Sequence, residues 1–313
     1  MPDWLAPLLS RLPPIALAVG IALGLAALWP RAWGPCSKRL SRHAIQVSIV
    51  LLGFWVSLEQ VALAGAAGLA FSTGAIVLVM LASIGLGALL KTDRDTATLL
   101  SAGTAICGGS AIAATGSAIN APPGTMAAAT AIVFLLNAAG VYAYPAVGHA
   151  LGLTDRQFGA WCAVGLHDVA GVVAAAAAFP KALAYATVIK LTRVLWIVPV
   201  ALTLARLSGR AGSEGREGAA RARTPFPWFI VLFLCACGLR AALDRVYGAA
   251  TVSPWADGAK MGATALLSFA LLLIGSAISR GTVARLGWRP VAHGVALWLV
   301  VSVAALAAAR AWM

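Results

Sequence analysis

Long apolar runs alternate with short polar segments along this chain, and the length of the runs predicts helices that cross a membrane. A hydrocarbon core about 30 Å thick requires about 20 residues of helix. Ten runs have roughly this length and are bounded by charged residues, Pro or Gly: 13–30, 43–60, 72–90, 97–119, 126–149, 158–179, 183–206, 226–246, 259–279 and 290–311. The pattern therefore predicts an all-α polytopic membrane protein with about ten transmembrane helices.

The basic residues between the runs predict an orientation. Cytoplasmic loops of membrane proteins carry an excess of Lys and Arg. If every run crosses, 15 of the 23 basic residues lie on one side and six on the other. We therefore expect a multi-pass protein of the cell (inner) membrane with both termini outside the cytoplasm. The Gly- and Arg-rich segment 207–225 predicts a flexible cytoplasmic linker.

Composition supports the lipid bilayer as the main partner. The chain is 61% hydrophobic and 11% charged, whereas a soluble domain has about 25% charged residues. The net charge of +13 lies in short runs between apolar segments, so we expect no nucleic-acid partner. The five cysteines show neither a disulfide framework nor zinc-ligand spacing. We expect no metal and no cofactor.

The ten runs divide into two sets of five, residues 1–152 and 153–313. An odd number of crossings in each half would make the halves inverted relative to each other, as in many secondary transporters. The sequence similarity between the two halves is short. It consists of "GSAIN" at 116–120, at the end of the fourth run, and "GSAIS" at 275–279, at the end of the ninth. Ala, Gly and Ser are abundant enough here for chance to produce it.

Ionisable residues interrupt two of the runs near their middle. At 1.5 Å per residue, Lys190 and Arg193 lie about 13–18 Å beyond Lys181, and His167 and Asp168 lie about 17–18 Å beyond Arg156. A charge at the bilayer centre costs at least about 2.5–3.5 kcal/mol and usually marks function. Two alternatives stay open: Asp168 could pair with a cation for purely structural reasons, and His167 could be a helix-packing histidine.

The fourth run contains "GTAICGGSAIAATGSAINAPPG" at 103–124, and its Cys107 reaches the same depth. The adjacent glycines Gly108 and Gly109 each lower helix stability by about 1 kcal/mol relative to Ala. They predict a broken helix whose free N–H groups, with the hydroxyls of Thr104 and Ser110, would bind an anion. The alternative is close helix packing through small residues. A Ser/His hydrolase lacks a recognisable nucleophile motif, so we expect no enzyme.

Several segments together resemble one known family. "GTAICGGSAIAA", "GLHDVAGVVAAA", "IKLTRVLWIVPV", "IVLLGFWVSL" and "PWFIVLF" are similar, in order and spacing, to segments of the YeiH-type family (UPF0324), which is labelled as sulfate exporters. Asp168 and Gly171 stand where that family has Glu and Gln. The resemblance implies the architecture of sodium/proton antiporters and bile-acid symporters, in which a core domain with two broken crossing helices packs against a panel domain. The crossing pair would be the fourth and ninth runs.

These observations predict a secondary transporter of a small anion: sulfate, another sulfur oxyanion or an organosulfonate. The coupling ion would be H⁺ or Na⁺, held by His167 and Asp168, since an imidazole has an ordinary pKa near about 6.5. The expected substrate-binding residues are Thr104, Cys107, Gly108, Gly109, Ser110, Lys190 and Arg193. One alternative is a cation/proton antiporter of the same fold, although the midplane holds one acid and two bases. Another is a membrane receptor that does not transport. A homodimer is a further expectation.

Overall fold

The computed structural model describes residues 5–28, 30, 33–179, 181–207, 228–281 and 286–312, and within them the regular structure is entirely helical. The all-α prediction is confirmed. In chain order the helices are α1 (Leu5–Leu25), α2 (Gly34–Trp55), α3 (Leu58–Leu90), α4 (Arg94–Ala105), α5 (Gly109–Ala118), α6 (Pro123–Ala150), α7 (Asp155–Gly165), α8 (Val169–Ala176), α9 (Ala182–Val194), α10 (Ile197–Leu207), α11 (Trp228–Tyr247), α12 (Ala249–Ser276) and α14 (Trp288–Trp312).

Several of these helices can cross a membrane by length and composition alone. Five apolar stretches satisfy both conditions: Gly68–Leu90, Pro123–Ala150, Ala182–Leu204, Ala249–Ser276 and Trp288–Trp312. The third of these joins α9 to α10 across a short turn at 195–196. The shorter apolar stretch Arg11–Leu25 lies in α1.

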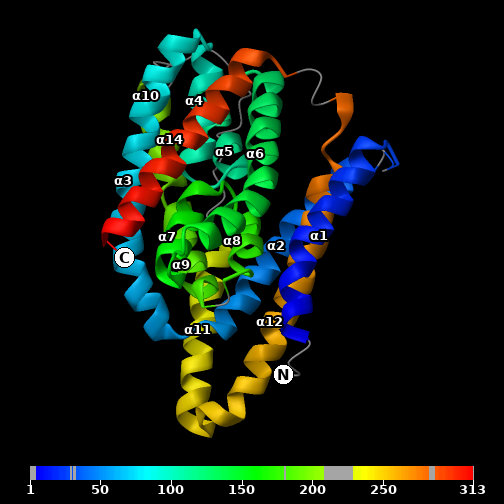
Figure 1. Cartoon of the computed structure of the whole chain (residues 1–313), viewed down its shortest axis with the longest axis vertical. Helices are drawn as coiled ribbons and strands as arrows, with labels where there is room; N and C mark the ends of the chain where they lie inside the picture. Colours follow the sequence, from blue (N-terminus) through cyan, green and yellow to red (C-terminus); the bar gives the residue numbers. More distant parts are fainter. Residues whose placement is uncertain are drawn as a thin grey trace, which may run out of the picture.

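The helices pack in two groups (Figure 1). The four-helix group consists of α1, α2, α11 and α12, and the remaining helices form the central group. Within the four-helix group, α1 and α12 are in backbone contact, because a Cβ added to Gly275 would lie 2.7 Å from the carbonyl oxygen of Leu17. Glycine at this crossing allows the two helices to approach closely.

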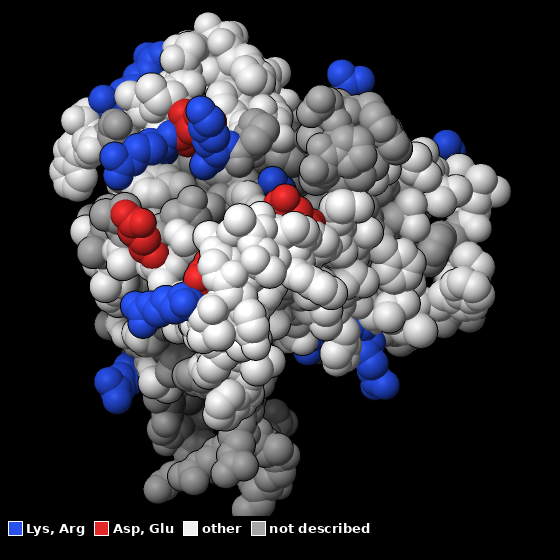
Figure 2. Space-filling view, turned by 90° about the horizontal axis from the view of Figure 1, so that it is seen from below, with Lys and Arg blue, Asp and Glu red and all other residues white. Residues whose placement is uncertain are grey.

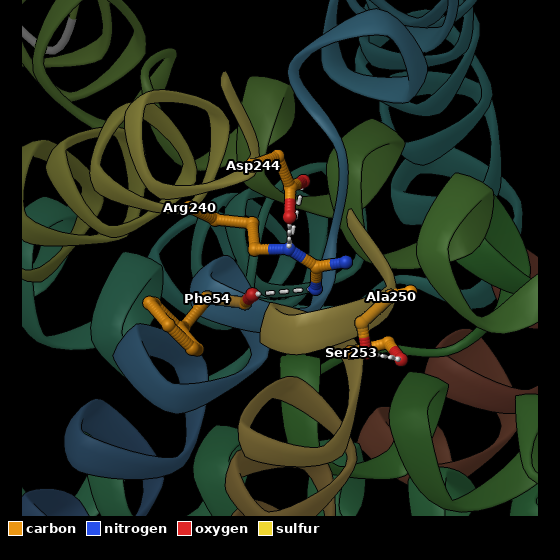
Figure 3. Close-up of polar contacts among 5 residues, drawn as sticks. All are labelled: Phe54, Arg240, Asp244, Ala250 and Ser253. Atoms are coloured by element: carbon orange, nitrogen blue, oxygen red, sulfur yellow. Dashed lines mark hydrogen bonds and ion pairs between the residues drawn. The ribbon is translucent and has the colours of Figure 1, made fainter. Parts of the chain in front are cut away.

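Arg240 of α11 forms an ion pair within its own helix and a hydrogen bond to α2 (Figure 3). Arg240 Nε donates to both carboxylate oxygens of Asp244 at 2.9 Å. The Nη1 atom of the same guanidinium donates at 3.5 Å to the carbonyl of Phe54, in the last turn of α2. Because the pair is partly exposed, it contributes no more than about 1 kcal/mol.

The α4 and α5 helices form a hairpin, here called hairpin 1 (94–118), rather than one crossing helix. A Cβ added to Gly103 in α4 would lie 2.9 Å from Cδ1 of Ile112 in α5. Nine residues of continuous helix would hold these positions about 13.5 Å apart. Beyond the end of α5, Ile119 joins the same apolar cluster as Leu99 from the first turns of α4. The predicted fourth crossing is therefore wrong, and this run re-emerges where it entered.

The α7 and α8 helices form a second hairpin, hairpin 2 (155–176). The rings of Phe158 and Phe179 stack with their centroids 3.8 Å apart, whereas a continuous helix would separate these positions by about 32 Å. Cys162 Sγ also donates to the carbonyl of Val172 at 3.8 Å across the hairpin. The predicted sixth crossing is wrong as well, because the chain turns back at residues 166–168, which include His167 and Asp168.

The two hairpins enter the molecule from opposite ends (Figure 1). The chain passes from hairpin 1 to hairpin 2 through α6, whose 28 residues span about 42 Å. Hairpin 1 opens at the start of α6 and hairpin 2 at its end. Both turns therefore lie in the middle of the molecule.

The ninth run does not contain the second broken helix. The α12 helix is continuous from Ala249 to Ser276, so the prediction that the fourth and ninth runs form a broken pair is wrong. The glycine of "GSAIS", Gly275, packs against α1 at the end of α12 and serves close helix contact. The second break lies in the sixth run instead, between α7 and α8.

Candidate functional site at the hairpin tips

The tips of the two hairpins, residues 106–108 and 166–168, meet beside the middle of α6. A Cβ added to Gly108 would lie 3.6 Å from both the Cβ and the carbonyl oxygen of His167. Thr104 Oγ1 lies 3.4 Å from His167 Nε2. Asn137 of α6 fixes the tip of hairpin 2, because its Oδ1 accepts from the backbone N–H groups of His167 at 2.9 Å and Asp168 at 3.3 Å. All the residues predicted from the sequence for this site lie on the hairpins or on α9.

Hairpin 1 turns at Gly108 because the backbone there has φ 69° and ψ −124°. Residues with a Cβ rarely adopt this conformation, while glycine does so without a steric cost. The turn ends α4 at Ala105 and lets α5 begin at Gly109. Gly108 N–H also donates back to the carbonyl of Gly103 at 2.9 Å. The adjacent glycines thus accompany a real break in the helix, as the sequence predicted.

Arg193 of α9 joins the C-terminal ends of both entering helices. At the end of α4, Nε donates to the carbonyl of Ala105 at 2.9 Å, and Nη2 donates to Ala105 and, at 3.1 Å, to Thr104. At the end of α7, Nη1 donates to Val164 at 2.6 Å and Ala163 at 3.2 Å. The side chain is completely buried, at 0% exposure. One guanidinium therefore satisfies four carbonyl groups that a helix end leaves without partners.

Lys190 and Trp298 complete the end of α7. Lys190 Nζ donates to the carbonyl of Leu166 at 2.6 Å, and Trp298 Nε1 donates to Gly165 at 2.9 Å. With the two bonds from Arg193, every carbonyl from 163 to 166 has a side-chain donor. Because a helix carries a partial negative charge at its C-terminus, a buried cation there is favourable.

The N-terminal ends of the returning helices differ from each other. The α8 helix is capped by Asp168, whose carboxylate accepts from the N–H of Gly171 at 2.5 Å. The α5 helix begins after Gly108, which supplies no side-chain cap. Its first-turn residue Ser110 is exposed, and Ser110 Oγ lies 2.8 Å from Cys107 Sγ. The Cys107 sulfur also accepts from the backbone N–H of Ala111. At the partially positive end of α5, the N–H groups of Gly109 and Ser110 are therefore left for an external acceptor.

His167 carries an unsatisfied nitrogen at this meeting point. Its side chain is 1% exposed, and in the part of the chain that the structure describes Nδ1 has no hydrogen-bond partner. Leaving a buried polar group unpaired costs about 1–3 kcal/mol. The tips thus combine a helix N-terminus that Gly108 does not cap with a buried nitrogen that has no partner among the described residues.

The side chains around the tips leave an excess of one positive charge. Lys190 and Arg193 are cationic and Asp168 is anionic, while the two C-terminal and two N-terminal helix ends offset each other. Among the described residues, the hydrogen-bond acceptors of both cations are backbone carbonyls and not carboxylates. The cations therefore compensate helix ends rather than pair with Asp168, and the excess charge favours a bound anion.

Two residues of this site escaped the sequence analysis. Asn137 interrupts the apolar stretch "FLLNAAG" and is buried, so a search for polar residues inside apolar runs could have found it. Trp298 lies among apolar residues of α14 and gives no comparable signal. Within the described ranges, no group of three or more His, Cys, Asp or Glu residues is arranged to hold a metal ion.

Comparison with known proteins identifies relatives along nearly the whole chain. Residues 5–294 match the family model described as "Conserved hypothetical protein 698". A UPF0324 membrane protein of Bacteroides thetaiotaomicron is 36% identical over 297 residues, which cover 94% of this chain and 85% of the relative. A UPF0324 membrane protein of Geobacter sulfurreducens is 39% identical over 298 residues, which cover 94% of this chain and 90% of the relative. No solved structure matches the chain.

Proposed function

This chain belongs to the UPF0324 family of membrane proteins, and from that premise we propose that it is a secondary transporter of a small anion that binds where the hairpin tips meet. The observation that carries the proposal is the open N-terminus of α5 beside the unpartnered Nδ1 of His167, at a site with one excess positive charge. Helix N-termini are common anion sites because their N–H groups point toward the ligand.

The direct ligands of the anion would come from hairpin 1. The backbone N–H groups of Gly109 and Ser110 open the first turn of α5, and Ser110 and Thr104 add hydroxyl donors. Cys107 and Gly108 shape the turn that places these groups. A tetrahedral sulfur oxyanion or an organosulfonate suits several N–H and O–H donors, since each oxygen accepts more than one hydrogen bond.

Lys190 and Arg193 would act on the anion mainly through their charge. Their hydrogen bonds hold the carbonyls of α4 and α7, so both cations keep the hairpin tips in place and make the local potential positive. This role keeps the charge compensation that the sequence predicted for them and adds the hydrogen bonds to the helix ends. His167 and Asp168 remain our candidates for H⁺ or Na⁺ coupling, because they are the imidazole and the carboxylate at the tip of hairpin 2.

The membrane topology that we infer has eight crossings and two hairpins that enter from opposite sides. The crossings are α1, α2, α3, α6, the pair α9–α10, α11, α12 and α14. An even number keeps both termini on one side, and we place them outside the cytoplasm of an inner membrane. The end of the molecule where Lys91, Arg94 and Arg206 lie would face the cytoplasm. The opposite end, seen in Figure 2, carries acidic as well as basic side chains.

Inverted repeats with the four-helix group as panel and the central group as core remain part of this proposal. The opposed hairpins are the feature that supports an inverted relation. The crossing count no longer does, because eight crossings put four, an even number, on each side of residue 152. The division at residue 152 and the homodimer remain predictions. The long linker 207–225 lies mostly outside the described residues.

A binding screen followed by transport tests the proposal. The purified protein is heated with sulfate, thiosulfate, sulfite, methanesulfonate or acetate at two pH values, and each stabilising anion is then tested for counterflow in proteoliposomes. We expect sulfur oxyanions or sulfonates to raise the melting temperature and to exchange across the membrane. Ser110→Ala should weaken both effects, because it removes a hydroxyl from the anion site without disturbing the carbonyls that Lys190 and Arg193 hold.

Each other outcome points to a different function. Exchange of Na⁺ for H⁺ without anion movement would indicate a cation/proton antiporter. Stabilisation by an anion without counterflow would indicate a receptor. Neither stabilisation nor counterflow with any of these anions would refute the anion site.

A further inference from the structure

A cavity of about 350 Å³ lies between the two helix groups, and its lining residues are distinct from those of the hairpin tips. Its lining comes from α1, α6, α8 and the turn after α8, and includes Arg11, Pro14, Val141, Tyr142, Ala174 and Ala178. The α6 and α8 residues belong to the halves of these helices that lead from the tips to the end where hairpin 2 enters. The cavity is therefore on the side that we assign to the exterior.

The inner end of the cavity lies about one helical turn from the hairpin tips. On α6, Val141 is four residues beyond Asn137, the residue that holds the tip of hairpin 2. On α8, Ala174 is three residues beyond Gly171, which Asp168 caps. One turn of helix rises about 5.4 Å. The lining then continues outward from Ala174, which is buried, to Ala178, which is exposed.

Arg11 supplies the charge of the cavity. Its side chain is exposed, and no described carboxylate forms an ion pair with it. The remaining lining is mostly alanine, proline and valine, so the guanidinium charge is not offset within the cavity. A guanidinium matches the geometry of sulfonate and sulfate oxygens, because it presents several N–H donors in one plane.

We propose that this cavity is an outer subsite in which Arg11 captures a small oxyanion before the anion passes along α8 to the hairpin tips. The proposal rests on the proposed transport function and adds an entry route to it. Tyr142 lines this route. Its hydroxyl donates to the carbonyl of Pro14 at 2.5 Å and so joins α6 to α1. The hydrogen bond connects the two helix groups at the cavity itself.

Charge-selective labelling of a cysteine in the cavity tests the subsite. Ala178→Cys is introduced into the full chain after the exposed Cys36 and Cys235 are changed to serine. It is then labelled in proteoliposomes with a sulfonate-bearing or a trimethylammonium-bearing methanethiosulfonate, and each rate is normalised to the rate with a free thiol.

The expected result follows from the charge of Arg11. A unit charge about 5 Å away in water changes a local ion concentration about fourfold, so we expect the anionic reagent to react several-fold faster. Arg11→Gln should remove the difference. Val147→Cys, exposed on α6 outside the cavity lining, is the matched control.

Protection by an anion gives a second measurement. Methanesulfonate should slow labelling of Ala178→Cys by an uncharged reagent when Arg11 is present, and should have no effect after Arg11→Gln. Equal reactivity toward both charged reagents, unchanged by Arg11→Gln, would overturn the outer subsite even if anion counterflow is observed. A different outcome is that labelling favours the anionic reagent and methanesulfonate protects, both only when Arg11 is present, while no anion is exchanged in counterflow. That outcome would support the subsite and refute transport.

Discussion

Replacing Arg193 with lysine should destabilise the protein strongly although the charge is kept. The guanidinium donates to carbonyls on two different helices, Thr104 and Ala105 at the end of α4 and Ala163 and Val164 at the end of α7. A lysine ammonium is a compact group with three donors that radiate from one nitrogen, so it cannot span both helix ends. At least two buried carbonyls would lose their partner.

The magnitude follows from those unsatisfied carbonyls. Each buried acceptor left without a donor costs about 1–3 kcal/mol, so two of them predict a loss of about 2–6 kcal/mol in the free energy of unfolding. The measurement is SDS-induced unfolding in mixed micelles, followed by the fluorescence of the 11 tryptophans. Hydrogen exchange should also increase at residues 104–108 and 163–168.

A matched substitution isolates the effect of position. Arg206 lies on α10 and is exposed, so Arg206→Lys should change the free energy of unfolding by less than about 0.5 kcal/mol. If Arg193→Lys behaved like this control and left exchange at both hairpin tips unaltered, the carbonyl interactions assigned to the guanidinium would be incorrect.

Three further substitutions test the tips and the helix packing. Gly108→Ala forces a side chain into a backbone conformation with φ 69°, and should cost about 1–3 kcal/mol and weaken anion binding, both measurable by thermal shift. Asn137→Leu leaves the N–H groups of His167 and Asp168 without their acceptor, and should cost about 2–6 kcal/mol in SDS unfolding. Gly275→Ala places a Cβ against the backbone of α1, and should lower the melting temperature while anion affinity is retained.

Matched glycines provide controls for two of these variants. Gly85 on α3 and Gly258 on α12 have no atoms within 4 Å of an added Cβ, so alanine at either position should be neutral or slightly stabilising. Wild-type stability for Gly108→Ala would show that the turn tolerates a side chain. Wild-type stability for Gly275→Ala would show that α1 and α12 can separate without loss.

The sequence predicted the depth of the site and one of its two breaks. Apolar runs of helical length placed His167, Asp168, Lys190 and Arg193 near one level, because helix rise converts residue number into distance. The adjacent glycines predicted the break that the structure shows at Gly108. The depth depends only on the number of residues along a helix, and the break depends on the low helix propensity of glycine. Both can therefore be predicted from the sequence without knowledge of the tertiary structure.

The path of the broken runs could not be read in the same way. An apolar run of about 20 residues satisfies its backbone either as one crossing helix or as two short helices that are buried in protein. Hairpin 1 folds back because Gly103 and Ile112 pack together, and hairpin 2 because Phe158 stacks on Phe179. Such contacts join residues whose proximity no periodicity reveals.

The sequence by itself determined an all-helical membrane protein with buried charges, since hydrophobic length and intramembrane cost act residue by residue. Tertiary structure decided what those charges do. The sequence predicted that Arg193 and Lys190 lie at the anion site and offset its charge, and the folded chain shows that their hydrogen bonds go to carbonyl groups of hairpins 1 and 2, at the ends of α4 and α7. Those carbonyls lack intrahelical partners because both helices end inside the protein, and only the folded arrangement brings the two ends to one guanidinium.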